Sequence, residues 1–434
     1  MISGLFTDFY QLTMGQMYFN NKGIGDKRVV FEMFIRSLPE GWKYFIASGI
    51  QDAVNKIADI KFLQEDIAFL RSKEMFSEEY LEYLSNFKFK GTIRGVLDGM
   101  VVFPNEPIVV VSGNIIECQM VETLLLNTIN YQTLICTKAR RVVESANGKP
   151  VIDFGMRRAQ GGSASVIGAK NCYLAGCVAT SNVYAGKEYD IPVSGTMAHS
   201  YVMSYGELHE DTAFDDFAKT FKKAILLVDT YDIGKGIIKA IDVAKKYYKT
   251  EHQVLGIRID SGNLAHWATF AKELAHSYDL GGFKVFVSND LNEYKIEELE
   301  KCGCIDGYGV GTEMITAKPV SAISGVYKLV EIDGVAVHKE SEGKKTIGGE
   351  KTLFRGIVNN HYNDFAVTKH AVEELNRIER WLNISYDYVY VGVFMSHKEN
   401  STKNVRDRIS NTSPLKNVTH EVSYSINGKI INKE

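Results

Sequence analysis

Polar side chains follow four short apolar runs in the middle of the chain, each at the point where a run ends. The runs are AILLVD (224–229), VLGIRID (254–260), FKVFVSND (283–290) and DGYGVGT (306–312). They supply Asp229 and Asp232, Arg258 and Asp260, Ser288 with Asn289 and Asp290, and finally Gly309, Gly311 and Thr312. For one such residue alone a helix N-cap is the favoured interpretation, because Asp, Asn and Ser accept hydrogen bonds from free N–H groups. Four such ends in succession predict an active site at the carboxyl edge of a parallel sheet.

The glycines of the last run favour an anion site. Gly309 and Gly311 have no side chains, so backbone N–H groups near Thr312 can approach an anion at the start of a helix. An anion is therefore the expected ligand of this turn.

Two further segments place chemically capable side chains beside presumed strands. The stretch VIDFGMRRAQGGSAS sets Phe154, Arg157 and Arg158 among glycines. A guanidinium can pair with a carboxylate or phosphate at two points. His199 follows the apolar run IPVSG. A lone histidine is often structural, but the register of His199 with the acidic strand ends favours a functional role.

These residues need a scaffold that brings several strand ends to one place. Residues 233–248 and 263–278 carry apolar side chains at three- and four-residue spacing, which indicates amphipathic helices that cover a sheet. With VIDF and IPVSG upstream, about six strands alternate with helices. The pattern predicts an α/β fold with an irregular TIM-like barrel, and a doubly wound open sheet is the alternative.

The two flanks have a different pattern. Residues 1–125 mix helical segments with short strands separated by turn glycines. Strand-like runs return near the C-terminal end, where a DG pair suits a hairpin. We expect residues 1–125 and 336–434 to form one discontinuous α+β sandwich domain around a barrel domain at 126–335.

The composition argues against nucleic-acid and membrane partners. The chain has 434 residues, is 45% hydrophobic and 24% charged, and has a formal net charge of −3. A binder of the phosphate backbone would show a clustered basic excess, and a spanning helix needs roughly 18 apolar residues in a row. The first residues meet Thr7 and Asp8 too soon for a signal sequence, and no C-x-x-C pair occurs among the six cysteines. We therefore expect a cytoplasmic protein with small-molecule partners.

Seven blocks of sequence, taken together, resemble the nicotinate phosphoribosyltransferases, which are type II phosphoribosyltransferases. The blocks are TDFYQLTM, FGMRRAQG, TSNVYAGKEYDIPVSGTMAHS, VDTYD, RIDSGNL, SNDLNE and GVGTEMITA with GVYKLVEI, in order from residue 7 to about residue 355. The lysine-rich segment KESEGKKTIGGEKTLFR is also similar, but it has Gly348 where the family has a proline.

The resemblance implies an activity. Enzymes of this family join nicotinate to phosphoribosyl pyrophosphate (PRPP), giving nicotinate mononucleotide and pyrophosphate in NAD salvage. They often couple this step to ATP hydrolysis through a phosphohistidine. It implies Mg²⁺ on the pyrophosphate oxygens, no metal site built from protein ligands alone, and a homodimer with the active site at the subunit interface.

The resemblance also implies roles for individual residues. Phe154 and a Tyr10 donated by the partner subunit would sandwich the pyridine ring, with Arg157 close to the substrate. Asp260 would hold the ribose hydroxyls beside Arg258, and Asp229 would be a second acid near the sugar. The remaining assignments are Gly309, Gly311 and Thr312 for the 5′-phosphate, Arg36 and Lys328 for pyrophosphate, and His199 as the phosphorylated residue. Arg158 equally suits a surface or interface ion pair.

Ser181 bears on the choice of substrate. The related enzyme for nicotinamide has an aspartate at this place, which would repel the carboxylate of nicotinate, whereas a serine hydroxyl can donate to it. Thr180 or Ser181 could at the same time be a helix N-cap. The alternatives are a nicotinamide phosphoribosyltransferase, more distantly a quinolinate phosphoribosyltransferase, and a non-catalytic protein that binds nucleotide phosphates.

Overall fold

The chain forms two compact units. In the computed structural model, the described residues are 2–340, 346–358, 361–368, 387–388, 391–392, 401–412, 415, 419–426 and 429–432. One unit comprises Met1–Thr137 with Ala322–Glu434, and the other comprises Lys138–Ser321. The first division falls inside helix α7 (Glu122–Ser145).

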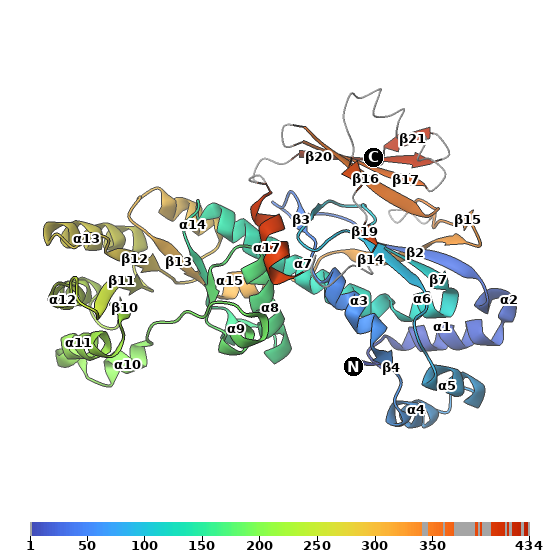
Figure 1. Ribbon diagram of the computed structural model, residues 1–434, viewed down its shortest axis with the longest axis horizontal. Helices are drawn as coiled ribbons and strands as arrows, with labels where there is room; N and C mark the ends of the chain where they lie inside the picture. Colours follow the sequence, from blue (N-terminus) through green and yellow to red (C-terminus); the bar gives the residue numbers. More distant parts are fainter. Residues whose placement is uncertain are drawn as a thin grey trace. The chain divides into compact units, whose positions relative to one another are not determined.

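The unit 138–321 is built on a six-stranded parallel sheet (Figure 1). Its strands, in spatial order, are β10 (Lys223–Leu227), β11 (Gln253–Ile259), β12 (Lys284–Val287), β13 (Gly307–Val310), β8 (Val151–Asp153) and β9 (Ala179–Thr180). Parallel pairing links each neighbouring pair. The predicted α/β class is confirmed, and β10 and β9 stand at the two ends of this partial barrel.

Five of the six strands lie where the apolar runs predicted them, but the expected strand at IPVSG is wrong. That segment, which contains Pro192, forms only an isolated bridge between Val193 and Thr180. Proline has no N–H to donate to a ladder, which disfavours a regular strand there. The sixth strand is instead β9, two residues long.

Helices follow most strands and cover the sheet. They are α8 (Gly162–Leu174), α9 (Val183–Tyr189), α10 (His199–Met203), α11 (Glu210–Thr220), α12 (Ile233–Lys246), α13 (Leu264–Ser277), α14 (Glu293–Glu300) and α15 (Thr312–Ile315). Figure 1 shows α11, α12 and α13 along one side of β10, β11 and β12, which they contact. The side chains of Asp232, Asn263 and Asn292 accept N–H bonds at the starts of α12, α13 and α14, so for Asp232 the N-cap interpretation is confirmed.

The core of this sheet is aliphatic and closely packed. Ile257 and Ile259 of β11 and Val285 and Val287 of β12 are fully buried. A Cβ atom at Gly256 would lie 2.0 Å from the carbonyl oxygen of Lys284, so glycine is needed for the two strands to approach.

The other unit contains mainly antiparallel sheets. One sheet has the order β15 (Val335–Ala336), β14 (Gly325–Ile332), β2 (Arg28–Ile35), β7 (Val109–Asn114), β5 (Thr92–Gly95) and β19 (Val391–Gly392). A second has the order β18 (Asp387–Tyr388), β16 (Lys351–Val358), β17 (His361–Thr368), β20 (Thr419–Ile426) and β21 (Lys429–Asn432). Two pairs complete the strands: β1 (Ile2–Ser3) with β4 (Ile60–Lys61), and β3 (Phe45–Ile46) with β6 (Val101–Val102).

Several helices belong to this unit. They include α1 (Phe9–Asn20), α2 (Lys22–Gly25), α3 (Ile50–Ala58), α4 (Gln64–Arg71), α5 (Glu78–Ser85), α6 (Ile115–Met120) and α17 (Thr402–Ser410). Helix α6 contacts β2 and β7, and α1 contacts α6. Among the described residues, no helix has both the length and the apolar content needed to cross a bilayer.

Candidate active site

The predicted site residues of the unit 138–321 gather at the carboxyl edge of its parallel sheet. Phe154 follows β8 and Asp260 follows β11, Asp229 lies two residues beyond β10, and His199 is the first residue of α10. Because parallel strands present their carboxyl ends at the same edge, residues far apart in the chain meet there. The strand ends thus bring acidic, basic and aromatic side chains together.

Asp229 and Asp260 are tied to one another across neighbouring strands. Oδ2 of Asp229 accepts hydrogen bonds from the backbone N–H of Asp260 at 3.0 Å and from Oγ of Ser261 at 2.6 Å. Oδ1 of Asp260 accepts from Oγ of Ser288 at 2.5 Å. The other oxygen of Asp229, Oδ1, is buried and has no partner among the described residues. These bonds hold two carboxylates in defined orientations.

The imidazole of His199 lies between a hydroxyl and a carboxylate. Its Nδ1 is 3.1 Å from Oγ1 of Thr230, and its Nε2 is 3.9 Å from Oδ2 of Asp260. The side chain is 40% exposed, so a substrate can reach the ring from solvent. A histidine that is oriented by neighbours and open on one side can act as a nucleophile.

Arg258 and Phe154 form a cation–aromatic pair. The guanidinium carbon of Arg258 lies 5.6 Å from the centre of the Phe154 ring, and Nη2 donates to the carbonyl of Met197 at 3.2 Å. Burial lowers the pKa of Arg258, the carboxylates of Asp260 and Asp229 act in the opposite direction, and Arg157 adds to the lowering. Nε of Arg258 is buried without a partner among the described residues.

The glycines of β13 make room for the aromatic ring. Gly309 is buried inside β13, and a Cβ atom there would lie 2.3 Å from the ring of Phe154. Gly311 precedes the short helix α15, which begins at Thr312. The expected contacts of Gly309, Gly311 and Thr312 with a 5′-phosphate stay a prediction. For Gly309 the structure adds a packing reason for glycine.

Ser181, Arg157 and Arg158 follow the carboxyl ends of the neighbouring parallel strands β9 and β8. Ser181 is half-buried directly after β9, and its N–H donates to the carbonyl of Asp153 at 2.8 Å. The N-cap of α9 is Asn182, not Thr180 or Ser181, because Oδ1 of Asn182 accepts from the next turn. Arg157 and Arg158 are exposed in a short 3₁₀ helix and form no ion pair with any described residue.

Three predicted site residues, Tyr10, Arg36 and Lys328, belong to the other compact unit. Tyr10 lies in α1 and is 48% exposed. Arg36 directly follows β2, and its N–H donates to the carbonyl of Ser324. Lys328 lies in β14 opposite Glu32 of β2. Their expected contacts with substrate stay predictions.

Several contacts within the site were not predicted from the sequence. Thr230 contacts His199, Ser261 bonds Asp229, and the carbonyl of Met197 holds Arg258. In VDTYD the threonine directly follows an acid at a strand end, which is a local signal for a second polar contact. The carbonyl of Met197 gives no signal in the side-chain pattern.

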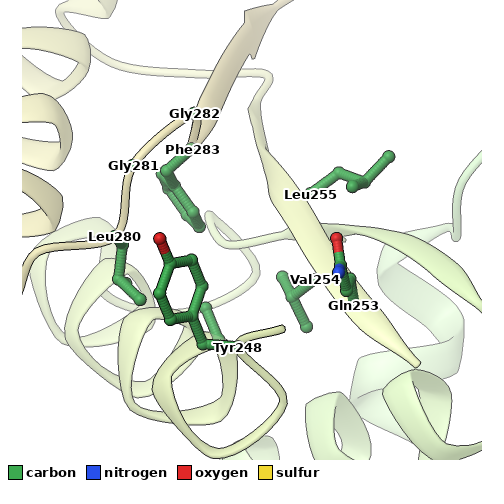
Figure 2. A pocket seen from close by; sticks show the side chains of 9 residues that line it. Tyr248, Gln253, Val254, Leu255, Leu280, Gly281, Gly282 and Phe283 are labelled. Carbon is green, nitrogen blue, oxygen red and sulfur yellow. The ribbon is translucent and has the colours of Figure 1, made fainter. Parts of the chain in front are cut away.

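Two further features concern where ligands could bind. Among the described residues, no cluster of three or more His, Cys, Asp or Glu side chains could hold a metal ion. A cavity of about 90 Å³ is lined by Tyr248, by Gln253–Leu255 and by Leu280–Phe283 (Figure 2). These segments precede or begin β11 and β12, so the cavity lies at the amino edge of the sheet and not at the site.

A parallel sheet that carries two acids, a histidine, an arginine and an aromatic ring at its carboxyl edge defines an α/β enzyme with a polar site. Two family models then identify the family. Residues 5–130 match the nicotinate phosphoribosyltransferase N-terminal domain, and residues 150–375 match the nicotinate phosphoribosyltransferase family. The chain therefore belongs to the nicotinate phosphoribosyltransferase family, as its motifs predicted.

Curated relatives support the same family assignment. A nicotinate phosphoribosyltransferase of Mycobacterium tuberculosis is 40% identical over 357 residues, which are 82% of this chain and 76% of the relative. The nicotinate phosphoribosyltransferase of Bacillus subtilis is 37% identical over 404 residues, which are 91% of this chain and 81% of the relative. The predicted class of enzyme is thus confirmed.

Solved structures share the fold. Human nicotinic acid phosphoribosyltransferase matches with a TM-score of 0.78 at 23% identity, over 96% of this chain and 97% of that chain. A nicotinate-nucleotide pyrophosphorylase of Pyrococcus furiosus matches with a TM-score of 0.73 at 21% identity, over 96% of each chain. At such identities the likeness concerns the fold alone.

Proposed function

We propose that this chain joins nicotinate to PRPP, releasing pyrophosphate and nicotinate mononucleotide, and couples this step to ATP hydrolysis through a phosphohistidine at His199. The observation that carries the proposal is the convergence of His199, Asp260 and Asp229 at one sheet edge, inside the segment 150–375 that matches the family. The product would enter NAD salvage.

The reaction at the sugar needs little proton transfer. The pyridine nitrogen of nicotinate attacks C1 of the ribose, and the bond between C1 and the pyrophosphate oxygen breaks with its electron pair leaving on pyrophosphate. As C1 becomes positive, the carboxylates of Asp229 and Asp260 would stabilise it, and Asp260 would also hold the ribose hydroxyls. Arg36 and Lys328 would bind the pyrophosphate. Positioning and charge stabilisation then supply most of the acceleration.

The pyridine ring would bind beside Phe154. We expect Phe154 to stack on one face of the ring and Tyr10 of the partner subunit to cover the other. Arg157 is exposed and forms no ion pair with a described residue, which leaves its guanidinium available to an anionic substrate. Ser181 would donate to the nicotinate carboxylate, so the acid is favoured over nicotinamide.

The coupling to ATP would run through His199. An imidazole nitrogen takes the γ-phosphoryl group while the bond to the β-phosphate oxygen breaks and ADP leaves. Water later removes the phosphoryl group as phosphate. Support comes from the contact with Thr230 and from the 40% exposure of the ring, because the acceptor must be both oriented and reachable.

Mg²⁺ would accompany the phosphates. Carboxylates are suitable ligands for this ion, which usually keeps waters and substrate oxygens as its other ligands. Oδ1 of Asp229 lacks a partner among the described residues, and Oδ2 of Asp260 is 3.9 Å from Nε2 of His199, so these carboxylates offer oxygen ligands. The ion would neutralise the charge of the departing pyrophosphate.

We further propose a cytoplasmic homodimer. In this dimer, Tyr10 and Arg36 of one subunit complete the active site of the other.

Turnover of the purified protein tests the function. PRPP is supplied with nicotinate, nicotinamide or quinolinate, with and without ATP, and the product is identified by mass spectrometry. We expect nicotinate mononucleotide, formed faster with ATP. A nicotinamide product would indicate the amide-specific enzyme, and no product from any base would leave a nucleotide-phosphate binding protein.

A further inference from the structure

Asp153 is a buried acid that the proposed chemistry does not use. It ends β8, is 0% exposed, and forms no ion pair with any described residue. Oδ2 accepts from the hydroxyl of Thr180 at 2.7 Å, and Oδ1 accepts from the N–H of Gly155 at 2.8 Å. Burial raises the pKa of Asp153, and the hydrogen bonds from Thr180 and Gly155 offset only part of that rise. Both oxygens are thus satisfied inside the protein, as a buried carboxylate requires.

The hydrogen bonds around Thr180 can run in only one direction. Thr180 is 1% exposed and pairs with Asp153 across the parallel strands β8 and β9. Its Oγ1 accepts from the N–H of Asn182 at 3.0 Å. A hydroxyl has a single proton, which here goes to Asp153 because a backbone N–H cannot accept. The carboxylate therefore terminates a directed chain from Asn182 through Thr180.

These hydrogen bonds fix the residues that flank Phe154 and Ser181, the two side chains assigned to the pyridine pocket. Phe154 lies between Asp153 and Gly155, which share a hydrogen bond, and its own N–H donates to the carbonyl of Val310 at 2.8 Å. Ser181 lies between Thr180 and Asn182, and its N–H donates to the carbonyl of Asp153. Asp153 thus connects the ends of β8 and β9 through both its side chain and its main chain.

We propose that Asp153 is a positioning residue for the pyridine pocket, holding Phe154 and Ser181 at the spacing that accepts nicotinate. This inference rests on the proposed function, which assigns Phe154 to the pyridine ring and Ser181 to the carboxylate. Asp153 itself touches no substrate. It acts through the strand ends that it joins.

An amide at this position cannot reproduce the arrangement. In Asp153→Asn the side chain has one acceptor oxygen and one NH₂ group for two donors. If the amide oxygen accepts from the N–H of Gly155, the NH₂ group faces the hydroxyl of Thr180. An NH₂ group cannot accept, so the hydroxyl proton of Thr180 loses its acceptor. Asparagine keeps the size of the side chain, so the change tests the acceptors and not the packing.

The test compares steady-state kinetics of wild type and Asp153→Asn. We expect the KM for nicotinate to rise about tenfold, the preference for nicotinate over nicotinamide to fall, and the KM for PRPP to stay unchanged, because small misplacements of a pocket cost rate steeply. An unchanged KM for nicotinate in the folded variant overturns the proposal. So does an equal rise of both KM values, which would indicate a general structural role.

Thr180 provides matched variants if Asp153→Asn does not fold. Thr180→Val removes the hydroxyl at similar size and should show the same selective loss for nicotinate, whereas Thr180→Ser should restore it. Asp190→Asn is the control, because Asp190 is an exposed acid in the left-handed region at the end of α9, which asparagine also tolerates. Its kinetics should match wild type, and a selective loss there would contradict the inference.

Calorimetric binding of nicotinate separates this inference from the proposed function. A wild type that forms no product refutes the function, yet its nicotinate affinity can still be compared with that of Asp153→Asn. Weaker binding in the variant supports the positioning role, and equal binding overturns it.

Discussion

At the scale of single residues, the proposed coupling to ATP depends on His199. We expect His199→Ala to abolish the stimulation by ATP and to leave slow turnover without ATP, because the pyridine and PRPP contacts do not need the imidazole. Turnover assays with and without ATP measure this. Stimulation that persists in the variant would contradict the phosphohistidine.

Thr230 offers a graded control for that experiment. Thr230→Val removes the hydroxyl 3.1 Å from Nδ1 of His199 at nearly the same size, so the ring keeps its place but loses its orienting contact. We expect a reduced response to ATP with the ATP-independent rate unchanged.

The sequence predicted the polar strand ends because that signal is local. An apolar run that stops at Asp229 or Asp260 is visible within a few residues of the chain. The bond of Thr230 to His199 joins residues 31 positions apart, and the role of the buried Asp153 depends on a partner 27 positions away. Such contacts arise from the order of strands in the sheet, which periodicity does not encode.

At the scale of elements, strand β13 has to leave space for the ring of Phe154, which directly follows β8. In Gly309→Ala the new Cβ would lie 2.3 Å from the Phe154 ring, so the ring must shift. We expect a loss of about 1–3 kcal/mol in the free energy of unfolding, as for other overpacked sites, and a higher KM for nicotinate. Thermal unfolding and steady-state kinetics measure both.

Gly162 is the matched control. A Cβ there meets nothing within 4 Å, and the residue begins helix α8. Gly162→Ala should therefore leave the KM for nicotinate unchanged. If both alanine variants behave alike, the contact between Gly309 and Phe154 does not explain the effect.

Helices α11 and α12 are joined by an acid with a shifted pKa. Burial raises the pKa of Asp215, but hydrogen bonds from Lys219, Lys246 and Tyr247 outweigh it and lower the pKa from 3.8 to about 2. Lys246 Nζ lies 2.7 Å from Oδ1 of Asp215, and Tyr247 donates to the same oxygen at 3.0 Å. Because the pKa is lower in the folded chain, the stabilisation is complete above pH 4 and is lost as the pH falls towards about 2.

Asp215→Asn should remove that pH dependence. We expect the variant to be about 1 kcal/mol less stable than wild type at pH 7, since such surface networks contribute modestly, and the difference to shrink near pH 2. Urea unfolding at both pH values measures it. A difference that is equal at the two pH values would exclude an ionised Asp215 as its source.

Short elements limited the prediction of the sheet. Strand β9 has two residues, Ala179 and Thr180, which is too few to show alternation. The segment around Val193 looked more like a strand, yet Pro192 cannot donate to a ladder. The pairing of Thr180 with both Asp153 and Val193 could be found only from the folded chain.

At the scale of the whole molecule, the proposed homodimer predicts complementation between two defective chains. Tyr10→Ala lacks the ring expected from the partner, and His199→Ala lacks the residue proposed to be phosphorylated. When the two variants are unfolded together and refolded, half of the dimers are mixed, and each mixed dimer has one site with both residues intact. We expect about a quarter of the wild-type ATP-dependent activity.

Each variant refolded alone is the control and should show no ATP-dependent activity. A mixture that stays as inactive as its components would mean that Tyr10 and His199 act within one chain, or that Tyr10 is not needed. Sedimentation at the assay concentration shows whether dimers are present.

The common direction of the strands in the unit 138–321 also has a practical consequence. The groups proposed to react in this unit lie at the carboxyl edge of the sheet, whereas the cavity near Gln253 and Phe283 lies at its amino edge. Gln253 is exposed. A dye or a surface tether attached beside it would therefore label or immobilise the protein without contacting the groups proposed to react. A biosensor for pyridine salvage could be anchored there.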